Sequence, residues 1–165
     1  MSLAPSSITL IDTAAHVQAD LTGGSSVIIS HLTDVTGITV QPSGTITLTA
    51  AQALASHVDD GAGSVMSLVT GGSLAVTGVA VAQIVTIMGL GVAPDSIQVT
   101  DTAAHVQADL TGGSSFILAN LSSMSGLSVS PPGAITLTVA EVTAAHIDDG
   151  AGSVMSMIGG GLTVT

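Results

Sequence analysis

Asp12-Thr-Ala-Ala-His-Val-Gln-Ala-Asp-Leu-Thr-Gly-Gly-Ser-Ser26 recurs without a change as Asp101 to Ser115, 89 residues further along the chain. The same offset carries Asp59-Asp-Gly-Ala-Gly-Ser-Val-Met-Ser67 onto Asp148 to Ser156. Repetition of this kind is typical of stacked units that share one continuous core. The chain therefore reads as an architectural protein rather than as an enzyme.

The offset also sets the domain organisation. Residues 1–95 form the first repeat unit, and residues 96–165 form a second, truncated unit of the same continuous array. The second copy stops after its last strand, whereas the first continues into the apolar run Gly78–Ala93. This run is interrupted by polar residues and is shorter than the roughly 20 residues of a membrane-spanning helix, so we predict a buried helix there.

Composition excludes several classes of partner. The 165 residues include no Lys and no Arg, and the formal net charge is −11 at pH 7. Such a chain cannot neutralise phosphates, so nucleic-acid binding and docking on anionic lipid are not expected. With no cysteine, disulfides and thiolate metal sites are absent as well. The first residues show no basic region followed by an apolar one, so no cleavable secretory signal is predicted there.

A short alternation of apolar, small polar and apolar residues marks the predicted strands. Residues two apart share a face of a strand, so the apolar pair points inward and the central residue outward. One face of the sheet is therefore apolar and the other polar, with helices on one face only. The motifs are Ile8–Leu10, Ile38–Val40, Ile46–Leu48, Leu74–Val76, Ile97–Val99, Leu127–Val129, Ile135–Leu137 and Leu162–Val164.

Helix start signals follow most of these strands. Thr49-Ala-Ala-Gln52 and Thr138-Val-Ala-Glu141 fit the capping box. Asp12-Thr13 and its copy Asp101-Thr102 offer further caps, each followed by two apolar residues four apart.

Two proline-containing segments, Gln41–Gly44 and Ser130–Gly133, are predicted to be tight hairpin turns. The fold class that results is α/β: a two-layer strand-helix solenoid of tandem repeats. Helices cover one face of a mostly parallel sheet that also contains tight hairpins.

The two ends of this array are predicted to be open. The N-terminal strand, with Ile8 and Leu10, has no preceding cover, and the C-terminal strand, with Leu162 and Val164, has no following one. Natural repeat arrays usually end in polar caps. We therefore expect a homo-oligomer in which these four residues mediate head-to-tail stacking into a filament.

Three stretches carry a resemblance: Ser96–Leu110, Ile135–Glu141 and Leu74–Val79. They resemble the repeat modules of large bacterial secreted and cell-surface proteins, which are adhesin-like and exported by type I systems. The resemblance implies an extracellular or cell-surface location and no catalytic residues. The chain departs from the pattern at His16 and His105, where that family usually has Asn.

The acidic loops are the strongest candidates for chemistry. Asp59, Asp60 and their copies Asp148, Asp149 lie in Gly-rich segments beside a histidine. A calcium or transition-metal site there is one interpretation, although neither loop has the alternating acids or closing Glu of a calcium loop. The other is a solvated loop whose Asp caps a helix.

No nucleophile or phosphate-loop motif occurs, so no enzyme activity and no obligatory cofactor are predicted. The leading hypothesis is an extracellular structural protein that assembles head to tail. The alternative is a monomeric adhesin-like binding module, with calcium dependence left open.

Overall fold

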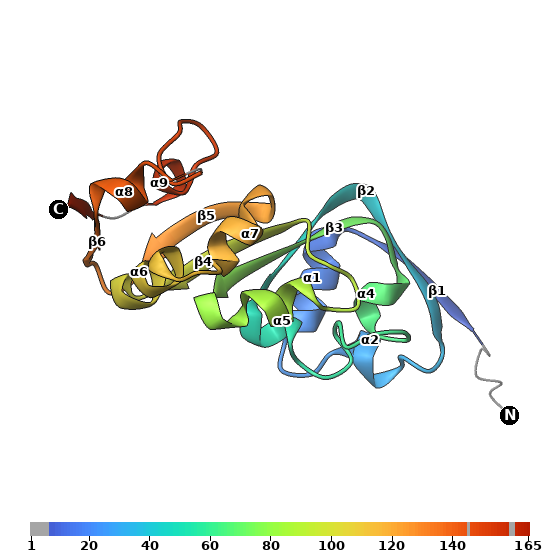
Figure 1. Cartoon of the computed structure of the whole chain (residues 1–165). Helices are drawn as coiled ribbons and strands as arrows, with labels where there is room; N and C mark the ends of the chain where they lie inside the picture. The colour runs from blue at the N-terminus through green and yellow to red at the C-terminus, as the bar shows by residue number, and fades with distance from the viewer. Residues whose placement is uncertain (1–6, 145, 159–160) are drawn as a thin grey trace, which may run out of the picture. The chain divides into compact units, whose positions relative to one another are not determined.

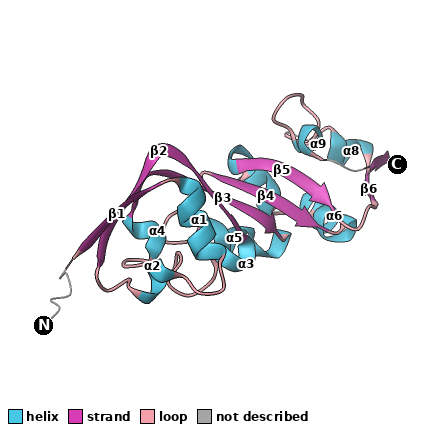
Figure 2. Cartoon of the chain, turned by 180° about the vertical axis from the view of Figure 1, so that it is seen from behind, coloured by secondary structure: helices cyan, strands magenta, loops and turns pink. Residues whose placement is uncertain are grey.

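The structure, a computed structural model, describes residues 7–144, 146–158 and 161–165. Figures 1 and 2 show its helices and strands from opposite sides. In chain order they are β1 (Ile8–Asp12), α1 (Ala14–Thr22), α2 (Val27–Ser30), β2 (Val35–Thr49), α3 (Ala50–Ala53), α4 (Val65–Leu68), β3 (Val69–Val79), the 3-10 helix η1 (Val81–Gln83), α5 (Ile84–Met88), β4 (Ser96–Asp101), α6 (Ala103–Thr111), α7 (Phe116–Ala119), the 3-10 helix η2 (Leu121–Ser123), β5 (Met124–Val129), β6 (Ala134–Leu137), α8 (Val139–Val142), α9 (Val154–Met157) and β7 (Gly161–Val164).

The fold is mixed α/β with a mostly parallel sheet, as the sequence predicts. Five strands follow the order β1-β2-β3-β4-β5, and β6 pairs with β7 in a separate parallel sheet. The two copies of the repeated strand use the same register, since Leu10 lies opposite Ile38 and Val99 opposite Leu127. The predicted strand motifs all fall within these strands.

The chain divides into two compact units. The first comprises residues 1–76 and 87–95, and the second comprises residues 77–86 and 96–165. Residues 77–86, which the repeat places at the end of the first copy, therefore pack with the second unit. This segment contains η1, which contacts both β4 and α6.

Burial follows the predicted alternation. Along β2, Ile38 and Ile46 are 0% exposed, whereas Thr39 between the buried positions is not buried. The polar face carries cross-strand hydroxyl contacts, such as Thr45 Oγ1 to Ser73 Oγ at 2.8 Å. The sheet therefore has one apolar and one hydroxyl-rich face in this part of the chain.

The predicted helix caps are confirmed. Thr49 and Thr138 form complete capping boxes, and the Thr13 hydroxyl accepts the N–H of His16. Helix α1 buries Val17 and Leu21 as expected. These caps satisfy main-chain donors that a short helix would otherwise leave exposed.

The hairpin prediction is wrong at both sites. Residues 41–44 lie inside the single strand β2, and β6 pairs with β7 rather than with β5. The Ser130 N–H donates to the Asp101 carbonyl at 2.9 Å, which extends the parallel pairing past the predicted turn. Gly44 serves close packing instead, because a Cβ there would lie 3.0 Å from that of Ala14.

The prediction of one helix over Gly78–Ala93 is also wrong. The strand β3 runs to Val79, and only η1 and the five-residue helix α5 follow. Gly78 adopts a φ of +66°, which redirects the chain out of the strand, and Ala80 is still extended. The run is apolar because Val81, Ile84 and Ile87 are buried, not because it is a long helix.

The alternation leads to a testable difference between neighbouring positions. Ile38→Ala should lower the free energy of unfolding by about 2–5 kcal/mol, because it leaves a cavity in a fully buried site. Thr39→Ala, on the hydroxyl-rich face, should change it by about 0.5 kcal/mol at most. Urea unfolding followed by circular dichroism measures both; equal losses would contradict the assignment of faces.

Candidate functional site

The repeated Asp-Thr-Ala-Ala-His stretch builds the same junction in both units, where a strand ends and a helix begins. Asp12 Oδ1 accepts the Thr13 N–H at 2.7 Å and meets His16 Nδ1 at 2.6 Å. Asp101 makes the same two contacts, with Thr102 and His105, both at 2.7 Å. The carboxylate therefore holds the helix start and orients the imidazole.

A second repeated acid holds the next short helix. Asp20 accepts the Val27 N–H at 2.9 Å and the Ile28 N–H at 3.2 Å, and the Ser26 hydroxyl also donates to it. Asp109 repeats the arrangement in the second unit. Both acids act as main-chain acceptors, which is a structural role.

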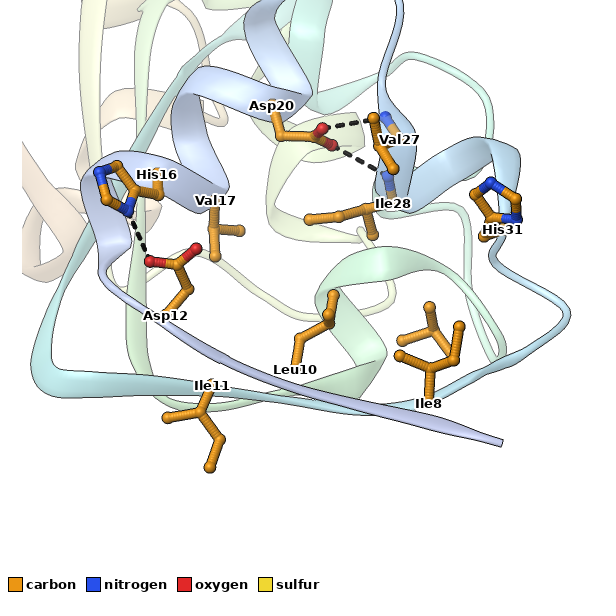
Figure 3. A pocket seen from close by; sticks show the side chains of 11 residues that line it. Ile8, Leu10, Ile11, Asp12, His16, Val17, Asp20, Val27, Ile28 and His31 are labelled. Carbon is orange, nitrogen blue, oxygen red and sulfur yellow. Dashed lines mark hydrogen bonds and ion pairs between the residues drawn. The ribbon is translucent and has the colours of Figure 1, made fainter. Parts of the chain in front are cut away.

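An apolar groove lies beside β1 in the first unit. It encloses about 360 Å³ between β1, α1 and α2, with Asp12 and His16 at one end. Figure 3 shows Ile8 and Leu10 pointing from β1 toward Val17 and Ile28 on these helices. Ile8 and Leu10 are half-buried, whereas their copies Ile97 and Val99 are 0% exposed.

The equivalent place in the second unit is partly filled by η1. Val81 and Ala82 lie beside Asp101 and His105, and the Val81 N–H donates to Asp101 Oδ2 at 2.9 Å. As a result the Asp101 side chain is 9% exposed, compared with 48% for Asp12.

The electrostatics of the two carboxyls follow from these contacts. The Thr13 N–H and the His16 ring hold the pKa of Asp12 below its ordinary value. Burial raises the pKa of Asp101, but the N–H groups of Val81 and Thr102 outweigh it with the help of His105, so the pKa is lowered overall. Both groups are therefore carboxylates at neutral pH.

In the acidic loop of the first unit, the two neighbouring carboxylates have different partners and different burial. Asp60 Oδ2 accepts the N–H of His57 at 2.9 Å, and this bond holds His57 at a φ of +67°. Asp59 is 0% exposed and accepts the Val92 N–H at 2.8 Å. Burial, together with the charge of Asp60, raises the pKa of Asp59 despite the bond to Val92.

The second copy of the loop has the same backbone but a different environment. His146 has a φ of +68° and donates its N–H to Asp149 Oδ2 at 3.1 Å. Asp148, the copy of Asp59, is exposed. Within the described ranges, no group of three His, Asp or Glu side chains is placed to hold a metal ion. A calcium site at Asp59, Asp60, Asp148 and Asp149 stays a prediction.

The predicted assembly residues lie on the two strands expected. Ile8 and Leu10 line the groove on β1, which stands at the edge of its sheet. Leu162 and Val164 lie in β7, opposite Ile135 and Leu137 of β6, and Val164 is 48% exposed. Among the described residues, both the β1 pair and the β7 pair therefore lie on an outer strand of their sheet.

Sequence reasoning missed the groove and the bond between Val81 and Asp101. Asp12 and Asp101 lie in identical stretches, so the repeat itself carried no signal for the different cover of the two junctions.

Comparison with protein-family models, with curated proteins and with solved structures found no match. None of the helices in the described part of the chain has the length and apolar character needed to cross a membrane.

Asp59 offers a test with a matched control. Asp59→Asn keeps an acceptor for the Val92 N–H but removes a buried charge, so at pH 7 it should stabilise the fold by about 1 kcal/mol, or roughly 2–4 °C in Tm. Asp148→Asn, in the exposed copy, should have no measurable effect.

The stability difference between the wild type and Asp59→Asn should depend on pH. Because the folded-state pKa of Asp59 is raised, the folded chain keeps a proton that the unfolded chain has released, and stability declines as pH rises from the ordinary value of 3.8 through the raised pKa. The advantage of Asp59→Asn should therefore vanish below pH 3.8. Thermal melts in chelator check this; a variant less stable than the wild type at pH 7 would contradict it.

Proposed function

We propose that this protein is a self-assembling structural subunit whose copies join head to tail, β7 of one copy beside β1 of the next, into a filament or surface layer. The single observation that carries the proposal is the position of these strands, each at the outer edge of a parallel sheet within the described residues. The resemblance to secreted repeat proteins supports an extracellular location.

The backbone directions of the two edges are compatible with such a junction. The Ile8 N–H donates to the Asp34 carbonyl at 2.7 Å, so Ile8 faces β2, and the next residue, Thr9, directs its backbone groups outward. The Thr165 N–H donates to the Leu137 carbonyl at 2.9 Å, so Val164 directs its N–H and C=O away from β6. Each edge therefore offers main-chain donors and acceptors to a parallel partner.

In the proposed junction, two different edges of identical subunits meet. Pairing of two different surfaces on identical subunits is heterologous and does not close on itself unless the rotation permits a ring. The repeats would then continue from copy to copy as a two-layer strand-helix solenoid.

Charge sets the conditions for assembly. Each copy carries −11, with no basic residue to offset it, so copies repel one another at low ionic strength. Salt screens this repulsion while leaving apolar contacts and main-chain hydrogen bonds in place. We expect assembly to increase with added salt, the reverse of an association driven by ion pairs.

A calcium-dependent, adhesin-like binding module is the second candidate function. It is favoured by two buried oxygens of the first unit, Asp59 Oδ2 and Ser64 Oγ, which have no hydrogen-bond partner among the described residues. A cation held there would stabilise the folded state by mass action. Thermal melts in calcium and in chelator decide between the candidates, because the assembly proposal requires no difference.

A backbone variant tests the assembly directly. Val164→Pro removes the N–H that faces the outer edge of β7 and keeps the N–H groups that face β6, so the subunit should fold but not join. Val164→Thr, which retains the N–H, is the matched control. Sedimentation across concentration, together with electron microscopy, should show filaments for the wild type and the control. The Pro variant should need at least about tenfold more protein to assemble.

A strictly monomeric wild type at high concentration and high salt would overturn the assembly proposal. Equal assembly of the Pro and Thr variants would also overturn it, because the junction would then not use the β7 edge.

A further inference from the structure

The groove beside β1 has a partly covered counterpart in the second unit, where η1 lies over the same junction and an opening of about 400 Å³ remains. In the second unit, residues 77–86 leave the strand β3 and lie over the junction between β4 and α6. Val81 is 7% exposed there. The first unit has the same strand-to-helix junction, but within the described residues no segment occupies the corresponding position.

The filling segment is held by its backbone as well as by its side chains. The Val81 N–H donates to Asp101 Oδ2, and the Ala80 N–H donates to Gln83 Oε1 at 3.1 Å, which closes the first turn of η1. Gly78, with a φ of +66°, brings the chain off the strand at the angle this requires. The junction in the second unit thus binds a bent apolar segment that donates one main-chain N–H to a carboxylate.

The first unit presents the same recognition elements. Asp12 Oδ1 is engaged by Thr13 and His16, as its copy is by Thr102 and His105, and no described group donates to Asp12 Oδ2. The floor is also equivalent, since Ile8 and Leu10 stand where the second unit has Ile97 and Val99. The first unit therefore presents the same acceptor and the equivalent floor positions to such a segment.

We propose that the groove of the first unit binds a donor segment from another polypeptide chain, of the Thr-Gly-Val-Ala-Val-Ala-Gln type seen at Thr77–Gln83, with one backbone N–H donated to Asp12 Oδ2. The proposal goes beyond the assembly function, because the Thr77–Gln83 segment of each further copy is held in that copy's own second unit, so the donor is a segment of a different partner chain. The negative charge of Asp12 selects an N–H donor, and the apolar walls select Val and Ala side chains.

A synthetic peptide tests the proposal on the whole chain. The probe is the sequence Leu74–Thr86 with a neutral, soluble tail, and its binding is measured by calorimetry on the Val164→Pro chain, which keeps its own copy of the segment in the second unit. One peptide should bind per chain. Methylation of the peptide nitrogen that corresponds to Val81 should weaken binding at least about tenfold, because it removes the hydrogen bond and adds bulk.

Protein variants locate the site. Leu10→Gln places a polar group in the half-buried floor and should weaken binding by a similar factor. Thr9→Gln, at the exposed neighbouring position outside the groove lining, should leave binding unchanged. The His16 ring signal in proton NMR should shift on binding while that of His105 stays in place.

The outcomes separate this inference from the assembly proposal. Specific peptide binding to a chain that never assembles would support the groove and overturn head-to-tail assembly. Filaments of wild type without peptide binding would support assembly and overturn the groove. Equal binding of the methylated peptide, or of a cationic peptide of scrambled sequence, would overturn the groove because Asp12 would then act only as a charge.

Discussion

Every carboxylate in this chain must be satisfied without a lysine or arginine, and this constraint organises the structure. Main-chain N–H groups take the place of cations. Asp101 accepts from Thr102 and from Val81, and Asp95 Oδ2 accepts the Leu74 N–H at 2.9 Å. A charge-assisted bond to an N–H is stronger than a neutral one, so these acids fix the stretches of backbone that donate to them.

As a consequence, the contacts where strands and helices begin or end stabilise the fold, rather than long helices. Helix α1 spans nine residues and several helices only four, lengths at which isolated helices are unstable in water. Their positions are set by acids, caps and side chains that reach the sheet. Gln18 Oε1, for example, accepts the Thr47 N–H at 2.7 Å and so ties α1 to β2.

Local features were predictable from the sequence and non-local ones were not. The strands and the capping boxes at Thr49 and Thr138 depend on residues within a few positions of one another, and all were predicted. The hairpin at Ser130–Gly133 failed because its outcome depends on Asp101, far away in the sequence. The helix over Gly78–Ala93 failed because a mostly apolar run does not show the periodicity that separates a helix from buried coil. The groove depends on what lies beside a repeated segment, which the segment itself does not encode.

The non-repeated stretch 77–95 explains why identical sequences have different environments. In the second unit it supplies Val81 to Asp101, and in the first unit it supplies Val92 to Asp59. Gly91 comes so close to the acidic loop that an added Cβ would lie 2.8 Å from the Cα of Gly61. The repeated stretches thus form receptors for this one segment. Asp12 and Asp148, the copies of Asp101 and Asp59 that this stretch does not contact, are both exposed, so cover by this one segment accounts for the difference within each repeated pair.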